Sequence, residues 1–251
     1  MSRHFAFVTV RASSTRLPNK CFETIAGNLS EIQVVIRRAL RIGCPVVLAT
    51  TTDSSDDRLE ALARAEGIDC FRGAVRNKIR RWADCFARHD ATAALLVDGD
   101  DPSFDYRVGA RALEMLDRDE AELVTSSPEL TPGFFTYGIS RPGIEKLLQQ
   151  APDPATDTDV ISEFINRAGL TRAWVPAAAD ERAGHDLRLT IDYPEDVAFY
   201  RELYRRVDYL APGPEIVRAA LENDLRRINW HRHQEFLDNQ NRFNEMVRQH
   251  G

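Results

Sequence analysis

Short apolar runs that stop at polar loops alternate with helix-like segments through the first part of the chain. The apolar runs cover residues 5–10, 45–50 and 93–97. After the first run, Ser30 and Gln33 form a predicted capping box, and apolar residues follow it at helical spacing. Strands that alternate with helices in this way predict an α/β fold with a mostly parallel sheet and right-handed crossovers. Such sheets bind ligands at the carboxyl ends of their strands, so the loops after these runs are the first candidates for a site.

Further along the chain the pattern is less regular but keeps the same kinds of element. Residues 1–210 are predicted to form one domain, and residues 211–251 a helical extension. The last helix, from Asn229 to His250, packs either on its own core or on a second copy of the chain. The other predicted strands are 70–71, 122–126, 134–140 and 187–191, and the other predicted helices are 53–67, 79–88, 142–148, 159–168 and 194–204.

Composition narrows the class of protein. The 251 residues are 43% hydrophobic and carry a formal net charge of -6 with a pI near 5.6, which argues against a nucleic-acid binder. No apolar run approaches a membrane span and no signal peptide precedes the first strand, so we expect a cytoplasmic protein. The cysteines are widely spaced without metal-ligand patterns and are read as reduced thiols, mostly in or near the core.

The loop at 11–20, with the sequence RASSTRLPNK, follows the first strand directly. It contains three cations, and the hydroxyl and backbone N–H groups between them are further donors. This composition favours a polyphosphate site, although a solvated basic turn is the alternative. The loop has neither the Walker A nor the G-x-G-x-x-G pattern. The cations are Arg11, Arg16 and Lys20, and the hydroxyl groups belong to Ser13, Ser14 and Thr15.

Carboxylates gather at two other predicted strand ends. Asp98, Asp100 and Asp101 follow one strand, and Asp192 follows another far along the chain. Mg²⁺ uses one or two carboxylates together with waters and substrate phosphates, so Asp100 and Asp192 are the candidate metal ligands. Taken singly, each aspartate is also a common turn or N-cap residue. A cationic loop and acidic strand ends together suit nucleotidyl transfer, with Arg16 and Lys20 on the pyrophosphate side.

Five stretches taken together resemble the cytidylyltransferases, and most closely the spore-coat polysaccharide biosynthesis group, which is related to the 3-deoxy-manno-octulosonate and acylneuraminate enzymes. They are RASSTRLPNK at 11–20, LATTTDSSDD at 48–57, FRG at 71–73, VDGDDPSFD at 97–105 and LRLTIDYPED at 187–196. The resemblance implies a three-layer, Rossmann-like nucleotide-diphospho-sugar transferase fold, with residues 1–210 as the nucleotidyltransferase domain. It also implies CTP and Mg²⁺ and an acidic sugar acceptor in surface-glycan precursor synthesis. A homodimer is expected from the packing of the C-terminal helix on a second copy of the chain.

The resemblance also assigns roles to individual residues. Arg16, Lys20 and Asp100 are the implied catalytic residues, and Asp100 and Asp192 the implied metal ligands. The implied nucleotide-binding residues are Arg11, Ser13, Ser14, Thr15, Arg16, Lys20, Thr50, Thr51, Asp53, Arg72, Gly73 and Asp98.

Several positions depart from the family pattern. Asn19 replaces a frequent glycine before Lys20, and Asp101 replaces the usual cysteine or glutamate after the G-D pair. A basic run at 74–81 stands where relatives have acidic residues, and it forms either a solvated helix face or a contact with an anionic acceptor. The alternatives are therefore a phosphorylated or phosphonate acceptor, another nucleoside triphosphate, or a degenerate protein that binds nucleotide without turnover.

Overall fold

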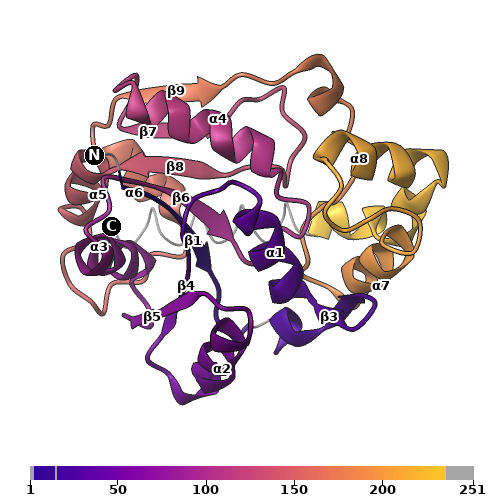
Figure 1. Ribbon diagram of the computed structural model, residues 1–251, viewed down its shortest axis with the longest axis horizontal. Coiled ribbons are helices and arrows are strands. Elements are labelled where there is room, and N and C mark those ends of the chain that lie inside the picture. Colours follow the sequence, from indigo (N-terminus) through magenta and orange to yellow (C-terminus); the bar gives the residue numbers. More distant parts are fainter. Residues whose placement is uncertain (1–2, 15, 236–251) are drawn as a thin grey trace.

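A mixed seven-stranded sheet forms the centre of the computed structural model, which describes residues 3–14 and 16–235 (Figure 1). Its strand order is β5-β4-β1-β6-β8-β7-β9. Only β8 runs antiparallel to its neighbours, β6 and β7. The strands are β1 His4–Thr9, β4 Val46–Thr51, β5 Asp69–Gly73, β6 Ala93–Asp98, β7 Leu123–Ser126, β8 Tyr137–Ser140 and β9 Arg172–Val175.

Helices cover both faces of the sheet, because alternate residues of the central strands point to opposite sides. In β1, Ala6 and Val8 join the core under α1, α2 and α4, whereas Phe7 joins the core under α3, α5 and α6. The predicted α/β architecture with a mostly parallel sheet between helical layers is confirmed. The helices are α1 Glu31–Leu40, α2 Asp57–Ala65, α3 Lys78–His89, α4 Tyr106–Asp117, α5 Arg141–Leu148 and α6 Ile161–Arg167.

A further group of elements lies beside α1 (Figure 1). Helices α7, Pro194–Leu203, and α8, Gly213–Glu222, extend the core that α1 covers, and the hairpin of β2, Thr24–Ala26, and β3, Leu29–Ser30, packs on α7. Buried Arg38 of α1 donates to the carbonyl oxygens of Phe104 at 2.7 Å and Ala211 at 2.8 Å. The described part of the C-terminal extension is therefore packed on the body of the molecule. Single-turn 3-10 helices complete the list: η1 Lys20–Phe22, η2 Ser54–Asp56, η3 Ala179–Arg182, η4 Leu225–Ile228 and η5 Trp230–Arg232.

The structure corrects some predicted elements. Residues 187–191 form no strand, because consecutive side chains are buried on more than one side and the backbone of Ile191 bonds to the Asp100 carbonyl at 2.9 Å instead of a sheet ladder. The strand predicted for 134–140 begins only at Tyr137, and α4, α8 and β9 were not predicted. The helix predicted from Asn229 begins instead with the 3-10 turn η5, and residues 236–250 of that prediction lie outside the described residues.

Within residues 3–14 and 16–235, no helix is both long and apolar enough to cross a membrane.

Candidate active site at the carboxyl ends of the strands

The loop after β1 folds back on itself and presents Lys20 at the start of η1. The backbone N–H groups of Ser14 and Asn19 both donate to the carbonyl of Ala12, at 2.9 and 3.1 Å. Asn19 has a left-handed φ of 61°, a conformation that asparagine tolerates better than most residues apart from glycine. This conformation explains how asparagine can stand where relatives often have glycine. Thr15 lies outside the described residues.

The loop after β6 crosses the end of β1 at very short range. The N–H of Gly99 donates to the Thr9 carbonyl at 2.9 Å, and a Cβ atom at Gly99 would lie 2.8 Å from that same oxygen. Only glycine fits this crossing without a backbone shift. The crossing places Asp98 and Asp100, on either side of Gly99, beside the loop that carries Lys20.

Lys20 joins the two predicted metal ligands. Its Nζ donates to Asp100 Oδ2 at 2.9 Å, to Asp192 Oδ1 at 3.1 Å and to the Ile191 carbonyl at 2.5 Å. The guanidinium of Arg16 reaches the same Asp192 oxygen at 2.6 Å. The structure therefore brings together Arg16, Lys20, Asp100 and Asp192, which come from distant parts of the sequence.

The charges of this cluster stabilise one another. Burial opposes the charge of Lys20, but the charges of Asp100 and Asp192 outweigh it and raise the pKa of Lys20 above its usual value. Burial also opposes ionisation of Asp100, yet the charge of Lys20 and its hydrogen bond lower the pKa of that carboxyl. Neighbouring Asp101 is different, since burial and the charges of Asp100 and Asp98 raise its pKa well above the usual range.

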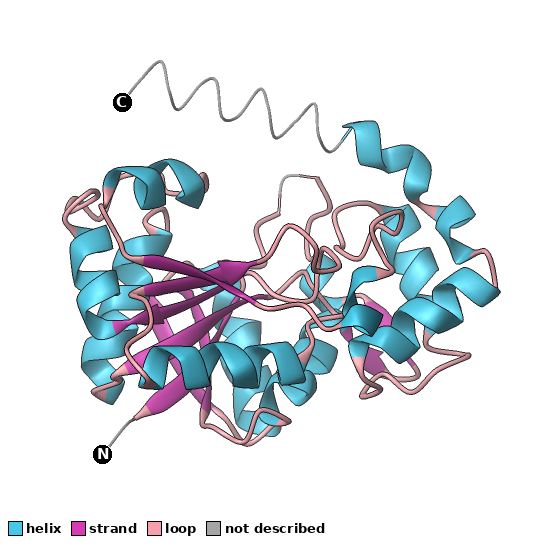
Figure 2. Ribbon diagram, turned by 90° about the horizontal axis from the view of Figure 1, so that it is seen from above, coloured by secondary structure: helices cyan, strands magenta, loops and turns pink. Residues whose placement is uncertain are grey.

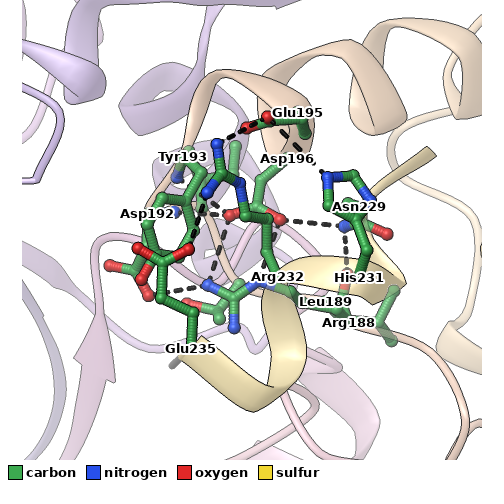
Figure 3. Close-up of polar contacts among 12 residues, drawn as sticks. Arg188, Leu189, Asp192, Tyr193, Glu195, Asp196, Asn229, His231, Arg232 and Glu235 are labelled. Atoms are coloured by element: carbon green, nitrogen blue, oxygen red, sulfur yellow. Dashed lines mark hydrogen bonds and ion pairs between the residues drawn. The ribbon is translucent and has the colours of Figure 1, made fainter. Parts of the chain in front are cut away.

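A second layer of polar residues holds Asp192 (Figure 3). Arg188 donates to Asp192 Oδ2 and to Asp196 Oδ1, both at 2.9 Å. The other oxygen of Asp196 accepts from the backbone N–H groups of Asp192 at 2.8 Å and Tyr193 at 3.0 Å, which caps the first turn of α7. Sequence reasoning missed Arg188 and Asp196, although an acidic residue in the first turn after Pro194 was an available capping signal.

Glu31, the first residue of α1, is another member that the sequence did not single out. Its side chain is fully buried, and within the described part of the chain neither carboxyl oxygen has a hydrogen-bond partner. Burial raises the pKa of Glu31 well above its usual value, against the opposing charge of Lys20, and the negative charges of Asp100 and Asp192 act in the same direction as burial. A neutral acid therefore lies behind the ionised cluster.

The cations of the basic run at 74–81 are divided between the interior and the surface of the protein. Lys78 points inward and donates to Asp98 at 2.8 Å, and Arg81 is 3% exposed and donates to the Ala74 carbonyl at 2.8 Å. Arg76 and Arg80 lie outside and pair with Asp157 and Asp84. Lys78 is thus a cation of the site that sequence reasoning noticed but did not assign to it.

The predicted nucleotide-binding residues after β4 are connected to the first loop through Asp56. Thr50 and Thr51 are buried, and their hydroxyl groups donate to Asp56, at 2.9 Å from Thr50. The other Asp56 oxygen accepts from the backbone N–H of Ala12 at 2.7 Å. Asp56, whose role the sequence did not reveal, therefore joins the end of β4 to the loop at 11–20.

The remaining predicted residues lie around this connection. Arg72 donates to the carbonyl oxygens of Thr51 at 2.9 Å and Asp53 at 2.8 Å, while the carboxylate of Asp53 accepts from the backbone of Ser55. A Cβ atom at Gly73 would lie 2.8 Å from the ring of Phe71. Ser13 is exposed, the Ser14 hydroxyl accepts from the Leu17 backbone at 3.4 Å, and Arg11 pairs with Asp159 at 2.7 Å, away from the Lys20 cluster.

The donor set at Lys20 has the composition that Mg²⁺ requires. Asp100 and Asp192 supply hard carboxylate oxygens that converge on one position, now taken by the Lys20 ammonium group. Among the described residues, no group of three or more His, Cys, Asp or Glu could hold a metal ion by itself. A pair of carboxylates that depends on phosphate and water for the remaining ligands is the usual arrangement for Mg²⁺.

A cavity of about 300 Å³ lies between β7, β8, α6 and β9. Burial and the nearby charge of Asp98 raise the pKa of Tyr137, in its wall, to about 12, so the cavity lies within electrostatic reach of the Asp98–Lys78 pair. Arg172 and Asn166 also line it, and further hydroxyl groups come from Thr125, Ser126, Thr136 and Ser162. The lining suits a small anionic molecule with several hydroxyl groups.

Comparisons with known proteins bear on the family and the fold of the chain. A family model described as cytidylyltransferase matches residues 5–133. The 3-deoxy-manno-octulosonate cytidylyltransferase of Methylobacterium radiotolerans is 29% identical over 228 residues, covering 88% of this chain and 83% of the relative.

Solved structures share the fold. A cytidylyltransferase from Leptospira borgpetersenii has a TM-score of 0.78 at 20% identity, covering 90% of this chain and 97% of that one. The CMP:2-keto-3-deoxy-manno-octonic acid synthetase complexed with CTP has a TM-score of 0.63 at 18% identity, covering 81% of this chain and 99% of that one.

Proposed function

The chain belongs to the cytidylyltransferase family, and we propose that it transfers CMP from CTP to an acidic sugar or related acceptor, releasing pyrophosphate. The observation that carries the proposal is the meeting of Lys20 and Arg16 with Asp100 and Asp192 at the carboxyl edge of the sheet. Phosphate-binding cations and metal-binding carboxylates are the two components that nucleotidyl transfer needs at one place.

In the proposed reaction, an acceptor oxygen attacks the α-phosphorus of CTP and the bond to the pyrophosphate breaks. Arg16 and Lys20 exchange their present carboxylate partners for phosphate oxygens and stabilise the charge on the leaving group. The loop at 11–20 supplies backbone N–H groups and the hydroxyls of Ser13, Ser14 and Thr15 along the triphosphate. Asp56 and Arg72 fix the segment after β4, where we place the nucleoside with Gly73 and Asp53 beside it.

Mg²⁺ is the proposed cofactor, and Asp100 and Asp192 are its proposed protein ligands. When bound, the metal would act as a Lewis acid and offset the negative charge of the phosphate groups. Arg188 binds the far oxygen of Asp192, and this contact orients the near oxygen toward Lys20. Asp98, which accepts a hydrogen bond from Lys78 at 2.8 Å, is a further proposed nucleotide-binding residue at this edge of the sheet.

The cavity between β7, β8 and α6 is the proposed acceptor site. Its hydroxyl groups and Asn166 suit a polyhydroxylated molecule, and Arg172 supplies a cation for an acidic group. We further propose a role in surface-glycan precursor synthesis and membership of the spore-coat branch. The proposal also includes a cytoplasmic location and a homodimer formed through residues 211–251. The glycan role and the branch extend from the resemblance of the motifs at 11–20, 48–57 and 187–196, while the location and the homodimer extend from the composition and from the C-terminal segment.

The proposal is tested by measuring pyrophosphate release with CTP and Mg²⁺ across a panel of sugar acids, phosphorylated sugars and phosphonates. We expect release with an acidic sugar, and a loss of kcat of at least about a hundredfold in Asp100→Asn, because the variant loses a ligand charge at the reacting phosphate. Asp84→Asn, which changes a surface aspartate paired with Arg80, is the matched control.

Two results would count against the proposal. Full activity of Asp100→Asn would remove the assigned role of this carboxylate. Binding of CTP without turnover on any acceptor would instead favour a degenerate, non-catalytic protein. Release with a phosphorylated acceptor alone would move the substrate class to the alternative that the basic run at 74–81 first suggested.

A further inference from the structure

A buried amide from the C-terminal segment reaches the residues that hold Asp192. Asn229 lies between η4 and η5, is fully buried, and donates both hydrogens of its side-chain amide. One goes to the Arg188 carbonyl at 3.0 Å and the other to Asp196 Oδ1 at 2.9 Å (Figure 3). The opposite orientation of the amide would aim its oxygen at two acceptors, so the surroundings determine which way Asn229 points.

The acceptors of Asn229 belong to the two residues that fix the candidate metal ligand, although Asn229 binds other atoms of them, the Arg188 carbonyl and Asp196 Oδ1. Asp196 binds the backbone N–H of Asp192, and Arg188 binds the Asp192 side chain. All of these side chains are at most 3% exposed, so the network is held in a low-dielectric interior where each hydrogen bond restricts movement. Asn229 is two contacts away from the Asp192 carboxylate and has no contact with the reacting position itself.

Other residues of the same segment bind the outer side of this turn. Arg232 donates to Glu195 at 2.9 Å, and its guanidinium lies 5.1 Å from the centre of the Tyr193 ring. Arg188 lies 5.3 Å from the centre of that ring (Figure 3). The described C-terminal segment thus contacts the residues on both sides of the Asp192 turn.

We propose that Asn229 is a positioning residue for the donor site, through which the C-terminal segment sets the orientation of Asp192. The inference rests on the proposed function, because it gives Asp192 the role of metal ligand. Asn229 lies outside the region that the family model matches and within the predicted C-terminal extension. The inference adds that this residue controls metal affinity at the edge of the sheet. Loss of the Asn229 donors would free Arg188 and Asp196 to move and would misplace Asp192.

The experiment measures Mn²⁺ binding to the full chain by electron paramagnetic resonance, with CTP present and no acceptor. Asn229→Leu keeps the shape of the side chain and removes both donors, and we expect the Kd for Mn²⁺ to rise about tenfold, the size typical of lost support behind a metal ligand. Asn223→Leu, at an exposed asparagine that bonds only to Ala219 and Arg206 in the described structure, should leave the Kd within about twofold of wild type.

A double variant separates positioning from a general loss of stability. In an Asp192→Asn background, Asn229→Leu should add less than about twofold to the Kd, because the ligand that it orients is already gone. If Asn229→Leu fails to fold by circular dichroism, Asn229→Ser, which keeps one donor, is measured in its place and should raise the Kd by a smaller factor.

Two outcomes would overturn the inference alone: Asn229→Leu binding Mn²⁺ as tightly as Asn223→Leu, or its full effect persisting in the Asp192→Asn background. A wild-type chain that binds no Mn²⁺ in the presence of CTP would overturn the proposed function and this inference together. Wild-type binding and pyrophosphate release with an unaffected Asn229→Leu would leave the proposed function in place.

Discussion

At the scale of single residues, the carboxyl groups of the site differ in whether a cation is paired with them. Lys20 favours the ionised form of Asp100, and Arg16, Lys20 and Arg188 pair with Asp192. Glu31, in contrast, is buried, and its carboxyl group has no hydrogen-bond partner among the described residues. A buried carboxyl group of this kind is stable only in its neutral form. A neutral Glu31 does not compete with Asp100 and Asp192 for the charge of Lys20. Burial of the Glu31 carboxyl group nevertheless lowers the stability of the fold.

Replacing Glu31 with methionine should stabilise the protein, and more so at high pH. The native protein retains a proton on Glu31 that the unfolded chain loses above a pH of about 4.3, so this residue makes wild-type stability fall as pH rises. Glu31→Met removes both that pH dependence and an unsatisfied buried polar group, whose cost is about 1–3 kcal/mol. Urea unfolding at pH 5 and pH 8 checks this.

The control is Glu215→Met, at an exposed acid in the first turn of α8. It should not become more stabilising between pH 5 and pH 8. A gain in the Glu31→Met protein that is equal at both pH values, or a loss at pH 8, would show that Glu31 is ionised in the native state.

At the scale of elements, the strand ends that carry the motifs were predictable and the support behind them was not. The apolar runs and the loops after them determine where Lys20 and Asp100 lie, since parallel strands end at one edge of the sheet. The turn around Asp192 was wrongly predicted to follow a strand, because alternating buried leucines look like a strand while buried Arg188 between them breaks the one-sided pattern. Ion pairs between separate segments leave no periodic signal in the sequence. The basic run was therefore noticed, but the pairing of Lys78 with Asp98 was not predicted.

Residues of β7, β8, α6 and β9 line the proposed acceptor cavity, and the only cation in the described lining is Arg172, on β9. Arg172→Gln should raise the KM for an acidic acceptor about 10- to 100-fold, the effect of one lost charged hydrogen bond, with the KM for CTP unchanged. Steady-state kinetics with each substrate varied in turn measure both values. Arg167→Gln, at the end of α6 and outside the lining, is the control.

An unchanged acceptor KM in Arg172→Gln would move the acceptor to another part of the site. An equal rise in the KM for CTP would indicate a general distortion of β9 rather than a lost contact with the acceptor.

At the scale of the whole molecule, one continuous core joins the sheet to the C-terminal helices. Ile216 and Val217 of α8 are buried in the same cluster as Val8 of β1 and Ile32 of α1. Arg38 and Asn229 add buried polar bonds between the body and the described part of residues 211–251. The extent of this packing could not be predicted from sequence, because polar contacts such as Arg38 with the Ala211 carbonyl depend on the assembled fold.

The central claim is that the edge of the sheet carrying Lys20, Asp100 and Asp192 binds a cytidine triphosphate. Calorimetric titration of the wild-type chain with CTP, UTP, ATP and GTP in Mg²⁺ tests it most directly. The account predicts that CTP binds at least about tenfold more tightly than the other three nucleotides, a difference of about 1.4 kcal/mol. Absence of CTP binding, or equal binding of all four nucleotides, would contradict it.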